Sequence, residues 1–228
     1  MLSVELHCHS ERSYDGRDSV DLLLEQAAAV GLDAIAVTDH DDIEASLAAV
    51  ERAPLYDLVG IPGVEISTAA GHVLALGIEK RIPSALTFGD TLARIHEAGG
   101  MAVVPHPFQE LRHGVLAQID RDELATADAI EVYNSRLLTG WSNRQARRFA
   151  GRRSLPMTAG SDAHIAEMVG QAVTKVDPNE TTAAAILEEI RQGRTVVEGH
   201  RTPWRVSARQ FAGGVHRRVA HRLRGFGK

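Results

Sequence analysis

The sequence contains a single cysteine, which excludes an internal disulfide and is typical of a reducing compartment. It also has no run of about 18 consecutive apolar residues, and its first residues enter a strand-like segment without a basic leader. We therefore expect a cytoplasmic protein without a transmembrane segment. No Pro/Ser/Gly linker divides the 228 residues, and 44% hydrophobic content suffices for one sizeable core, which predicts a single domain.

Acidic residues are missing from the last part of the chain. Residues 201–228 hold eight of the 25 Lys and Arg residues and no Asp or Glu, so residues 1–200 carry 17 basic against 30 acidic residues, a net charge of −13. An acidic body argues against broad phosphate-backbone binding by the core but suits a site that collects cations. Solubility alone is the other explanation for this charge. We treat residues 1–200 as the domain and residues 201–228 as a basic tail.

The basic tail shows apolar residues at roughly helical spacing, with arginines between them. This pattern predicts an amphipathic helix. Such a helix would bring nucleic acid or an anionic membrane surface to the acidic body, or it would dock on that body or on a second subunit. Both interpretations stay open.

The body alternates between strand-like and helix-like segments, which predicts a parallel sheet covered by helices. No Gly-x-Gly-x-x-Gly loop follows the first strand, so a dinucleotide-binding fold is not indicated. Strands are expected over residues 4–9, 33–40, 58–67, 71–77, 101–107, 129–134, 156–164 and 170–176, with 71–77 as a hairpin partner of 58–67. Helices are expected over residues 19–30, 42–52, 89–98, 143–150 and 182–191.

Polar residues stand at the ends of six of these apolar runs, spread over the whole chain. In an extended strand, residues two apart share a face, so His7 and His9 point one way while Cys8 points to the other side. The same alternation puts Asp162 and His164 on one face. Because the carboxyl ends of barrel strands form one mouth, we prefer a β/α barrel to an open sheet.

The polar strand ends supply a set of nitrogen and oxygen ligands without any thiolate. A lone histidine is more often a satisfied core or surface residue, but six of the eleven histidines stand at or beside strand ends, together with three carboxylates. The candidate ligands are His7, His9, Asp15, His40, Glu65, His72, His106, Asp162 and His164. These exceed what one ion needs, so two or three divalent ions are expected. Their chemistry favours Mn, Zn or Fe over Mg, which prefers oxygen.

Several ordered motifs resemble those of the PHP (polymerase and histidinol phosphatase) family, over residues 2 to 200. They are His7-Cys8-His9-Ser10, Ser13-Tyr14-Asp15-Gly16, Thr38-Asp39-His40-Asp41, Gly63-Val64-Glu65, Pro105-His106-Pro107, Glu131-Val132-Tyr133-Asn134 and Gly160-Ser161-Asp162-Ala163-His164. The resemblance implies a distorted (β/α)7 TIM-like barrel with up to three metal ions at its C-terminal mouth.

The resemblance also implies how the ligands divide among the ions. His7, His9, Glu65 and Asp162 would hold the first ion. Glu65 would bridge to a second ion bound by His106 and His72, where an exposed hairpin position is the other interpretation of His72. Asp15, His40 and His164 would hold the third. Asp39 precedes His40 and points away from it, so we expect a supporting role for Asp39.

The implied activity is that of a metal-dependent phosphoesterase, which hydrolyses a phosphate ester by attack of a metal-bridged hydroxide. Asp162 would orient the hydroxide, Asn134 lies near the mouth, and Arg136 or Arg12 would bind the substrate phosphate unless they are solvated loop residues. A short segment, residues 107–128, stands where many family members have a covering insertion. The open mouth this predicts would suit a phosphorylated small molecule, a nucleotide or a nucleic-acid end.

Three other functions compete with the phosphoesterase. A nuclease acting on DNA or RNA ends would prefer oligonucleotides to mononucleotides. A non-catalytic binding subunit would have no need to keep nine clustered polar groups. Hydrolysis of a C–N bond also uses barrel histidines and aspartates, but the division of ligands fits it less well.

Overall fold

The computed structural model describes residues 1–109, 119–137 and 140–200. Helices in these ranges are α1 (Val20–Ala29), α2 (Glu44–Arg52), α3 (Phe88–Glu97), α4 (Arg121–Leu124), α5 (Gly140–Arg153) and α6 (Ala183–Arg191). Strands are β1 (Leu2–Cys8), β2 (Ala34–Val37), β3 (Val59–Gly60), β4 (Gly63–Thr68), β5 (Gly71–Leu76), β6 (Met101–Val104), β7 (Ala129–Asn134), β8 (Met157–Gly160), β9 (Ala172–Val176) and β10 (Val196–Gly199). The predicted alternation of strands and helices is confirmed.

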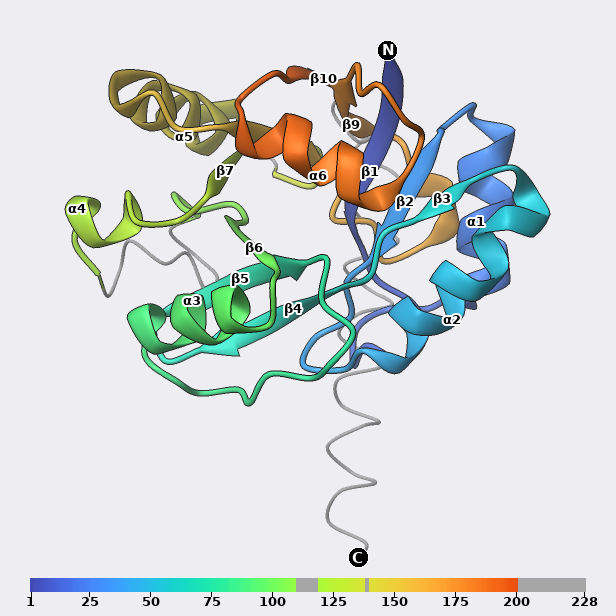
Figure 1. Ribbon diagram of the computed structural model, residues 1–228, viewed down its shortest axis with the longest axis horizontal. Helices are drawn as coiled ribbons and strands as arrows, with labels where there is room; N and C mark the ends of the chain where they lie inside the picture. Colours follow the sequence, from blue (N-terminus) through green and yellow to red (C-terminus); the bar gives the residue numbers. More distant parts are fainter. Residues whose placement is uncertain (110–118, 138–139, 201–228) are drawn as a thin grey trace, which may run out of the picture.

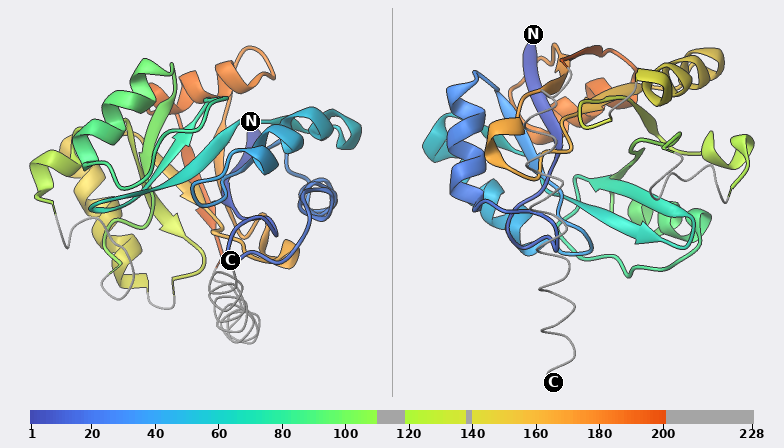
Figure 2. Two further views of the ribbon diagram at one scale, coloured as in Figure 1. Left: turned by 90° about the horizontal axis from the view of Figure 1, so that it is seen from below. Right: turned by 180° about the vertical axis from the view of Figure 1, so that it is seen from behind.

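The described strands form two five-stranded sheets (Figures 1 and 2). The first has the order β10-β9-β1-β2-β3 and the second β4-β5-β6-β7-β8. Parallel pairs join β1 to β2, β2 to β3, β6 to β7 and β7 to β8, while β4–β5, β5–β6, β1–β9 and β9–β10 are antiparallel. The hairpin predicted for residues 71–77 is present as β5.

The two sheets meet at the ends of the strands that carry polar residues. Isolated parallel bridges pair Cys8 with Ala163 and His40 with Glu65. Within the described residues, the ladders are otherwise separate, so the hydrogen bonding forms two sheets. The distorted (β/α)7 barrel that the family resemblance implies is therefore not closed by hydrogen bonds in these residues. These two bridges bring polar residues of both sheets close together.

A run predicted as one strand, residues 58–67, is divided between the sheets. β3 pairs with β2 in the first sheet, whereas β4 pairs with β5 in the second. Ile61 and Pro62 connect them, and proline lacks the N–H that a continuous ladder requires. The break carries the chain from one sheet to the other and places Glu65 beside His40.

Successive residues of the strands point to opposite faces, so the apolar core consists of a cluster between the sheets and two clusters under the helices. A central cluster combines Leu6, Leu74 and Val103 from both sheets with Ile186 from α6. Their sequence neighbours face outward, against α1 and α2 on one side and against α3 and α5 on the other. Helices therefore cover the outside of the strands, as all three ribbon views show (Figures 1 and 2).

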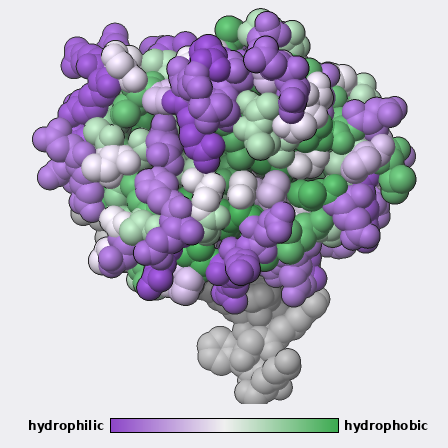
Figure 3. Space-filling model, viewed as in Figure 1, coloured by the Kyte–Doolittle hydropathy of each residue, from purple (hydrophilic) through white to green (hydrophobic). Residues whose placement is uncertain are grey.

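Three of the described helices begin beside a hydroxyl side chain that caps them. Ser19, Thr87 and Thr182 each accept a hydrogen bond from a backbone N–H in the first turn of α1, α3 and α6. The face shown in Figure 3 mixes hydrophilic and hydrophobic patches. No helix in the described ranges is long and apolar enough to cross a membrane. The predicted amphipathic tail and residues 110–118 of the short mouth segment lie outside those ranges.

Candidate metal centre

All nine candidate ligands converge where the two sheets meet. Their side chains are at most 10% exposed, so each loses nearly all contact with water. Their ligating atoms form four overlapping groups, within each of which the atoms lie within 4.8 Å of one another. The groups are His9 with Asp15, His40 and His164; His7 with His106 and Asp162; His7 with His9 and Glu65; and His40 with Glu65 and His72.

Glu65 lies at the centre of these groups. Five histidine rings surround its carboxylate, three near Oε2 at 3.1 to 3.4 Å and two near Oε1 at 2.7 and 3.5 Å. They are His7, His9 and His40 at Oε2, and His72 and His106 at Oε1. A carboxylate placed in this way can contribute one oxygen to each of two cations.

The position of His72 removes the sequence ambiguity about its exposure. It pairs with Ser67 in the β4–β5 hairpin, is 8% exposed, and directs Nδ1 to Glu65. His72 groups with His40, however, and His106 groups with His7. Both His72 and His106 nevertheless lie beside Oε1 of Glu65, so the shared ion that the family pattern implies stays a prediction.

Asp162 reaches the centre by a route that strand alternation does not describe. β8 ends at Gly160, and Asp162 adopts a left-handed backbone with φ of 52°. Its carboxylate still lies 3.3 Å from Nδ1 of His164. The expectation that a strand end places both residues on one face is thus wrong about the backbone, although the two side chains do meet.

Asp15 and His164 form the far side of the cluster. Nε2 of His164 lies 3.0 Å from Oδ2 of Asp15, while its Nδ1 lies 2.9 Å from the carbonyl oxygen of Asp162. With the proton on Nδ1, His164 donates to that carbonyl and keeps a lone pair on Nε2. The ring of Tyr14 stacks on His40 with centroids 4.7 Å apart, a contact that the motif pattern does not predict.

Glu131 is a buried member of the site to which the sequence interpretation gave no role. Its Oε1 lies 2.9 Å from Nδ1 of His7, and its Oε2 accepts hydrogen bonds from the backbone N–H of His106 and the side chain of Asn134. A register shift in β7 between Glu131 and Tyr133 allows Glu131 and Asn134 to face the same site. A carboxylate inside an otherwise apolar strand was the available signal, because buried charge needs a partner.

The carboxylate of Glu131 orients His7 toward the cluster. If the proton of His7 sits on Nδ1, it is donated to Glu131, and Nε2 keeps its lone pair beside Glu65. Carboxylate partners of this kind fix the tautomer of metal-binding histidines. Asp39 acts elsewhere: it accepts hydrogen bonds from the backbone and hydroxyl of Ser10, which agrees with the supporting role expected for it.

Arg136 and Arg12 lie in different surroundings. Nη1 of Arg136 lies 3.1 Å from Oδ1 of Asp162 and 3.1 Å from Nε2 of His164. Arg12 instead pairs with Asp42 and Glu44, and its side chain is 45% exposed. The geometry therefore brings Arg136 to the centre and leaves Arg12 in a solvated ion-pair cluster. Asn134 donates to Asp162 at 3.3 Å, so it too belongs to the centre.

Mutual electrostatics set the protonation of the carboxylates. Burial raises the pKa of Glu65, but the surrounding histidines His40, His72 and His7 outweigh it, so the pKa lies well below its usual range. Burial likewise raises the pKa of Asp162, but Arg136 and the neighbouring histidines together lower it further than burial raises it. Burial raises the pKa of Asp15 too, but His164, His9 and His40 together outweigh it and lower the pKa. The three carboxyl groups are therefore ionised at neutral pH.

The histidines fall into two classes. Burial lowers the pKa of His40 to about 3 and, together with His164, lowers the pKa of His9. Burial also acts to lower the pKa of His7 and His72, but Glu65 and the other carboxylates nearby together outweigh it and raise the pKa of both. Neutral rings can bind a cation at once, whereas protonated rings must first release a proton.

These residues fit divalent cations. Nδ1 of His9 is buried without a hydrogen-bond partner in the described ranges, while Nε2 of His9 and Nδ1 of His40 face the carboxylate of Glu65 at 3.1 and 3.4 Å. Ionised carboxylates lie beside them, and buried charge of one sign is costly unless it is paired. Imidazole and carboxylate together suit Zn, Mn or Fe. The donor set therefore supports divalent metal binding, while the geometry alone leaves the metal and the number of ions open.

Comparisons with known proteins point to one family. A family profile described as PHP-associated matches residues 140–195. An uncharacterized protein of Methanocaldococcus jannaschii is 35% identical over 119 residues, which are 50% of this chain and 50% of that protein. A phosphoribosyl 1,2-cyclic phosphate 1,2-diphosphodiesterase of Eggerthella lenta is 36% identical over 99 residues, or 40% of this chain and 37% of that enzyme. The chain thus matches half or less of the length of these relatives.

Solved structures resemble the fold over most of the chain. A two-domain protein of Bacteroides vulgatus containing a predicted PHP-like metal-dependent phosphoesterase aligns with a TM-score of 0.75 at 22% identity, covering 87% of this chain and 65% of that one. The lesion-specific endonuclease EndoQ of Pyrococcus furiosus aligns with a TM-score of 0.64 at 16% identity, covering 86% and 57%. At these identities the likeness concerns the fold alone. The profile match and the sequence relatives, beside this likeness in fold, support a PHP domain family for the chain.

Proposed function

We propose that this protein hydrolyses phosphate esters with the help of more than one divalent cation. The observation that carries the proposal is the shared carboxylate of Glu65, surrounded by five histidines, with Arg136 beside Asp162 at the same centre. Several adjacent cations suit phosphoryl chemistry, because phosphoryl transfer concentrates negative charge on oxygens that need stabilising. A guanidinium fork next to them suits a phosphate.

The ligands named above would hold the cations, which when bound lower the pKa of water and neutralise phosphoryl oxygens. Arg136 has a donor at the edge of the centre and would orient the substrate phosphate. Asn134 and Arg136 both contact the carboxylate of Asp162 and so fix the direction of its oxygens. Glu131 holds His7 in the tautomer that faces the centre.

A nuclease is the second candidate for the same site. EndoQ of Pyrococcus furiosus, whose fold this chain resembles, is a lesion-specific endonuclease, and the relative from Eggerthella lenta is a phosphodiesterase. Both names refer to phosphodiester bonds, so the proposal extends to diesters as well as monoesters. A nuclease predicts faster hydrolysis of oligonucleotides than of mononucleotides.

The proposal is tested by phosphate-ester hydrolysis with added Mn²⁺ or Zn²⁺ on nucleotides, oligonucleotides, sugar phosphates and bis(p-nitrophenyl) phosphate. We expect Asp162→Asn to lower kcat/KM at least about 100-fold, because loss of a mere hydrogen-bond partner of a metal ligand costs up to that much and Asp162 is itself a candidate ligand. Asp177→Asn, at a residue whose side chain is 79% exposed, is the matched control and should leave the rate unchanged. Absence of hydrolysis on every substrate after metal reconstitution would reject the proposal.

A further inference from the structure

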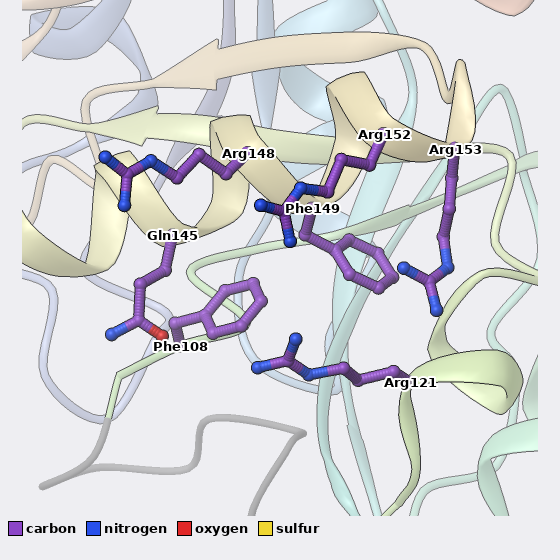
Figure 4. Close-up of a pocket in the computed structure, with 7 residues that line it drawn as sticks. All are labelled: Phe108, Arg121, Gln145, Arg148, Phe149, Arg152 and Arg153. Atoms are coloured by element: carbon purple, nitrogen blue, oxygen red, sulfur yellow. The ribbon is translucent and has the colours of Figure 1, made fainter.

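A second concave site lies between α5 and the segment that follows β6. It is a cavity of about 180 Å³ whose floor contains the rings of Phe108 and Phe149, 5.9 Å apart and inclined at 61°. Both rings are buried, at 8% and 3% exposure, so they are core residues covered from outside. Figure 4 shows arginines from α5 and α4 reaching over them.

Among the described residues, four arginines and Gln145 make up the rest of the lining, and none of these lining residues is acidic. Arg121 lies over the ring of Phe108 at 5.9 Å, and Arg153 lies over Phe149 at 4.5 Å while it pairs with Asp122. Arg148 and Arg152 have no carboxylate partner in the described part of the chain. Clustering cations costs free energy through repulsion, so an anionic ligand would relieve it.

The charge continues along the whole of α5. This helix, GWSNRQARRFAGRR, carries five arginines and no acidic residue, on a body whose net charge is strongly negative. Arg144, Arg148 and Arg152 are four residues apart, so they form one stripe roughly 12 Å long. A stripe of this length matches a chain of phosphates better than one compact anion.

The start of α5 is attached to the metal centre. The side chain of Asn143 donates to the carbonyl of Asn134 and accepts from its N–H, at 3.0 and 3.1 Å. Phe108, in the floor of the arginine pocket, follows the candidate ligand His106 by two residues. Trp141 stands at the same end of the helix, 52% exposed, with Arg144 5.7 Å from its ring centroid.

We infer that the arginine stripe of α5 and the arginine pocket bind the phosphate backbone of a single-stranded nucleic acid. Guanidinium forks contact successive phosphates, and the exposed indole of Trp141 offers a face on which a base can stack. The bound nucleic acid would then run past Asn143 toward the metal centre. The inference rests on the proposed phosphoester hydrolysis, for which it names nucleic acid as the substrate class.

The test measures how tightly the full chain binds a 5′-fluorescein-labelled, single-stranded DNA of 20 nucleotides. Binding is monitored by fluorescence anisotropy at several salt concentrations, without added metal. The variant is Arg148→Ala/Arg152→Ala, and the matched control is Arg94→Ala/Arg191→Ala, which removes the same charge from α3 and α6. We expect at least about 10-fold weaker binding for the first variant, and a slope of log K against log salt that falls by about 1.4. The control should bind like the unmodified protein.

Equal affinity of both double variants would overturn the inference, as would the absence of binding by the unmodified chain at low salt. Trp141→Ala should weaken binding while leaving the salt slope unchanged, since stacking releases no counterions. Hydrolysis of bis(p-nitrophenyl) phosphate is measured in parallel and should be unaffected by Arg148→Ala/Arg152→Ala. Loss of hydrolysis in every protein would reject the proposed function, and the anisotropy result would still decide the inference.

Discussion

Two arginines compete for the substrate phosphate, and their surroundings separate them. Arg136 contacts Asp162 and His164, whereas Arg12 is occupied by Asp42 and Glu44 at the surface. We expect Arg136→Ala to raise KM for a phosphate ester by about 10-fold or more, since a charge-assisted hydrogen bond contributes roughly 1.5 to 3 kcal/mol. Arg12→Ala should change KM less than about two-fold. Initial-rate kinetics on one substrate give the KM of both variants. Equal effects of the two changes on KM would contradict the assignment of Arg136 as the arginine that binds the substrate phosphate.

Residue types and their order were sufficient to predict that these nine side chains lie together, while their binding of metal stays a prediction. Their arrangement was beyond the sequence, because it depends on backbone departures at Asp162 and in β7. The role of Glu131 follows from a register shift that no spacing rule reveals. Arg12 and Arg136 could not be ranked either, because ranking them required knowing which carboxylates lie within reach.

The protonation of one buried residue, Glu5, should make the free energy of unfolding depend on pH. Burial raises its pKa from 4.5 to about 7, although its carboxylate accepts hydrogen bonds from the backbone of His7, Ser161 and Gly170. The folded state therefore keeps this proton at pH values where the unfolded chain has lost it. Its contribution is fully favourable below pH 4.5 and declines as the pH rises to about 7.

The change is of the order of 3 kcal/mol, from about 1.4 kcal/mol for each pKa unit. The contribution of Glu5 is measured by urea unfolding of chelator-treated protein at pH 5 and pH 8, for both the unmodified protein and Glu5→Gln. The free energy of unfolding of the unmodified protein should fall relative to the variant between these two pH values. A difference between the two proteins that is the same at both pH values would contradict the prediction.

β8 passes so close to its neighbours that only glycine fits at its end. A Cβ on Gly160 would lie 2.5 Å from Oε1 of Glu131 and 2.5 Å from Cβ of His7. We expect Gly160→Ala to destabilise the fold by roughly 1 to 3 kcal/mol and to weaken metal binding, because both contacted residues face the centre. Thermal unfolding and metal titration measure the two effects.

Gly151 provides the control. Its Cβ would meet only Cε of Met157 at 3.5 Å, and alanine is favoured over glycine within α5. Gly151→Ala should therefore be neutral or stabilising by about 0.5 to 1 kcal/mol. If Gly160→Ala were equally harmless, the close packing of β8 against the centre would not constrain the site.

At the level of elements, the helices were the most predictable part. Periodicity and caps placed α1, α3 and α6 within a residue or two of their observed ends. Strand pairing was harder to predict from the sequence. The division of residues 58–67 at Pro62 moves β4 into another sheet, and the short β10 pairs with β9 at a sheet edge that no motif marks. Pairing across a sheet depends on distant residues, whereas a helix depends on near ones.

Cations should stabilise the whole molecule. Three ionised carboxylates are buried at the seam of the two sheets, and a ligand that binds only the folded state raises its stability. Mn²⁺ or Zn²⁺ at about 1,000 times Kd should increase the free energy of unfolding by about 4 kcal/mol for each site. Mg²⁺ at the same concentration should do less. A chelator that leaves the unfolding temperature unchanged would contradict this expectation.

The central claim is that Glu65 joins adjacent cation sites at the meeting point of the two sheets. Elemental mass spectrometry of untagged protein, reconstituted with Mn²⁺ or Zn²⁺ and freed of excess metal, tests it most directly. We predict more than one ion per chain, and a clear loss of bound metal in Glu65→Gln, which keeps the shape but removes the charge. At most one ion per chain, or the same metal content in Glu65→Gln, would contradict the claim.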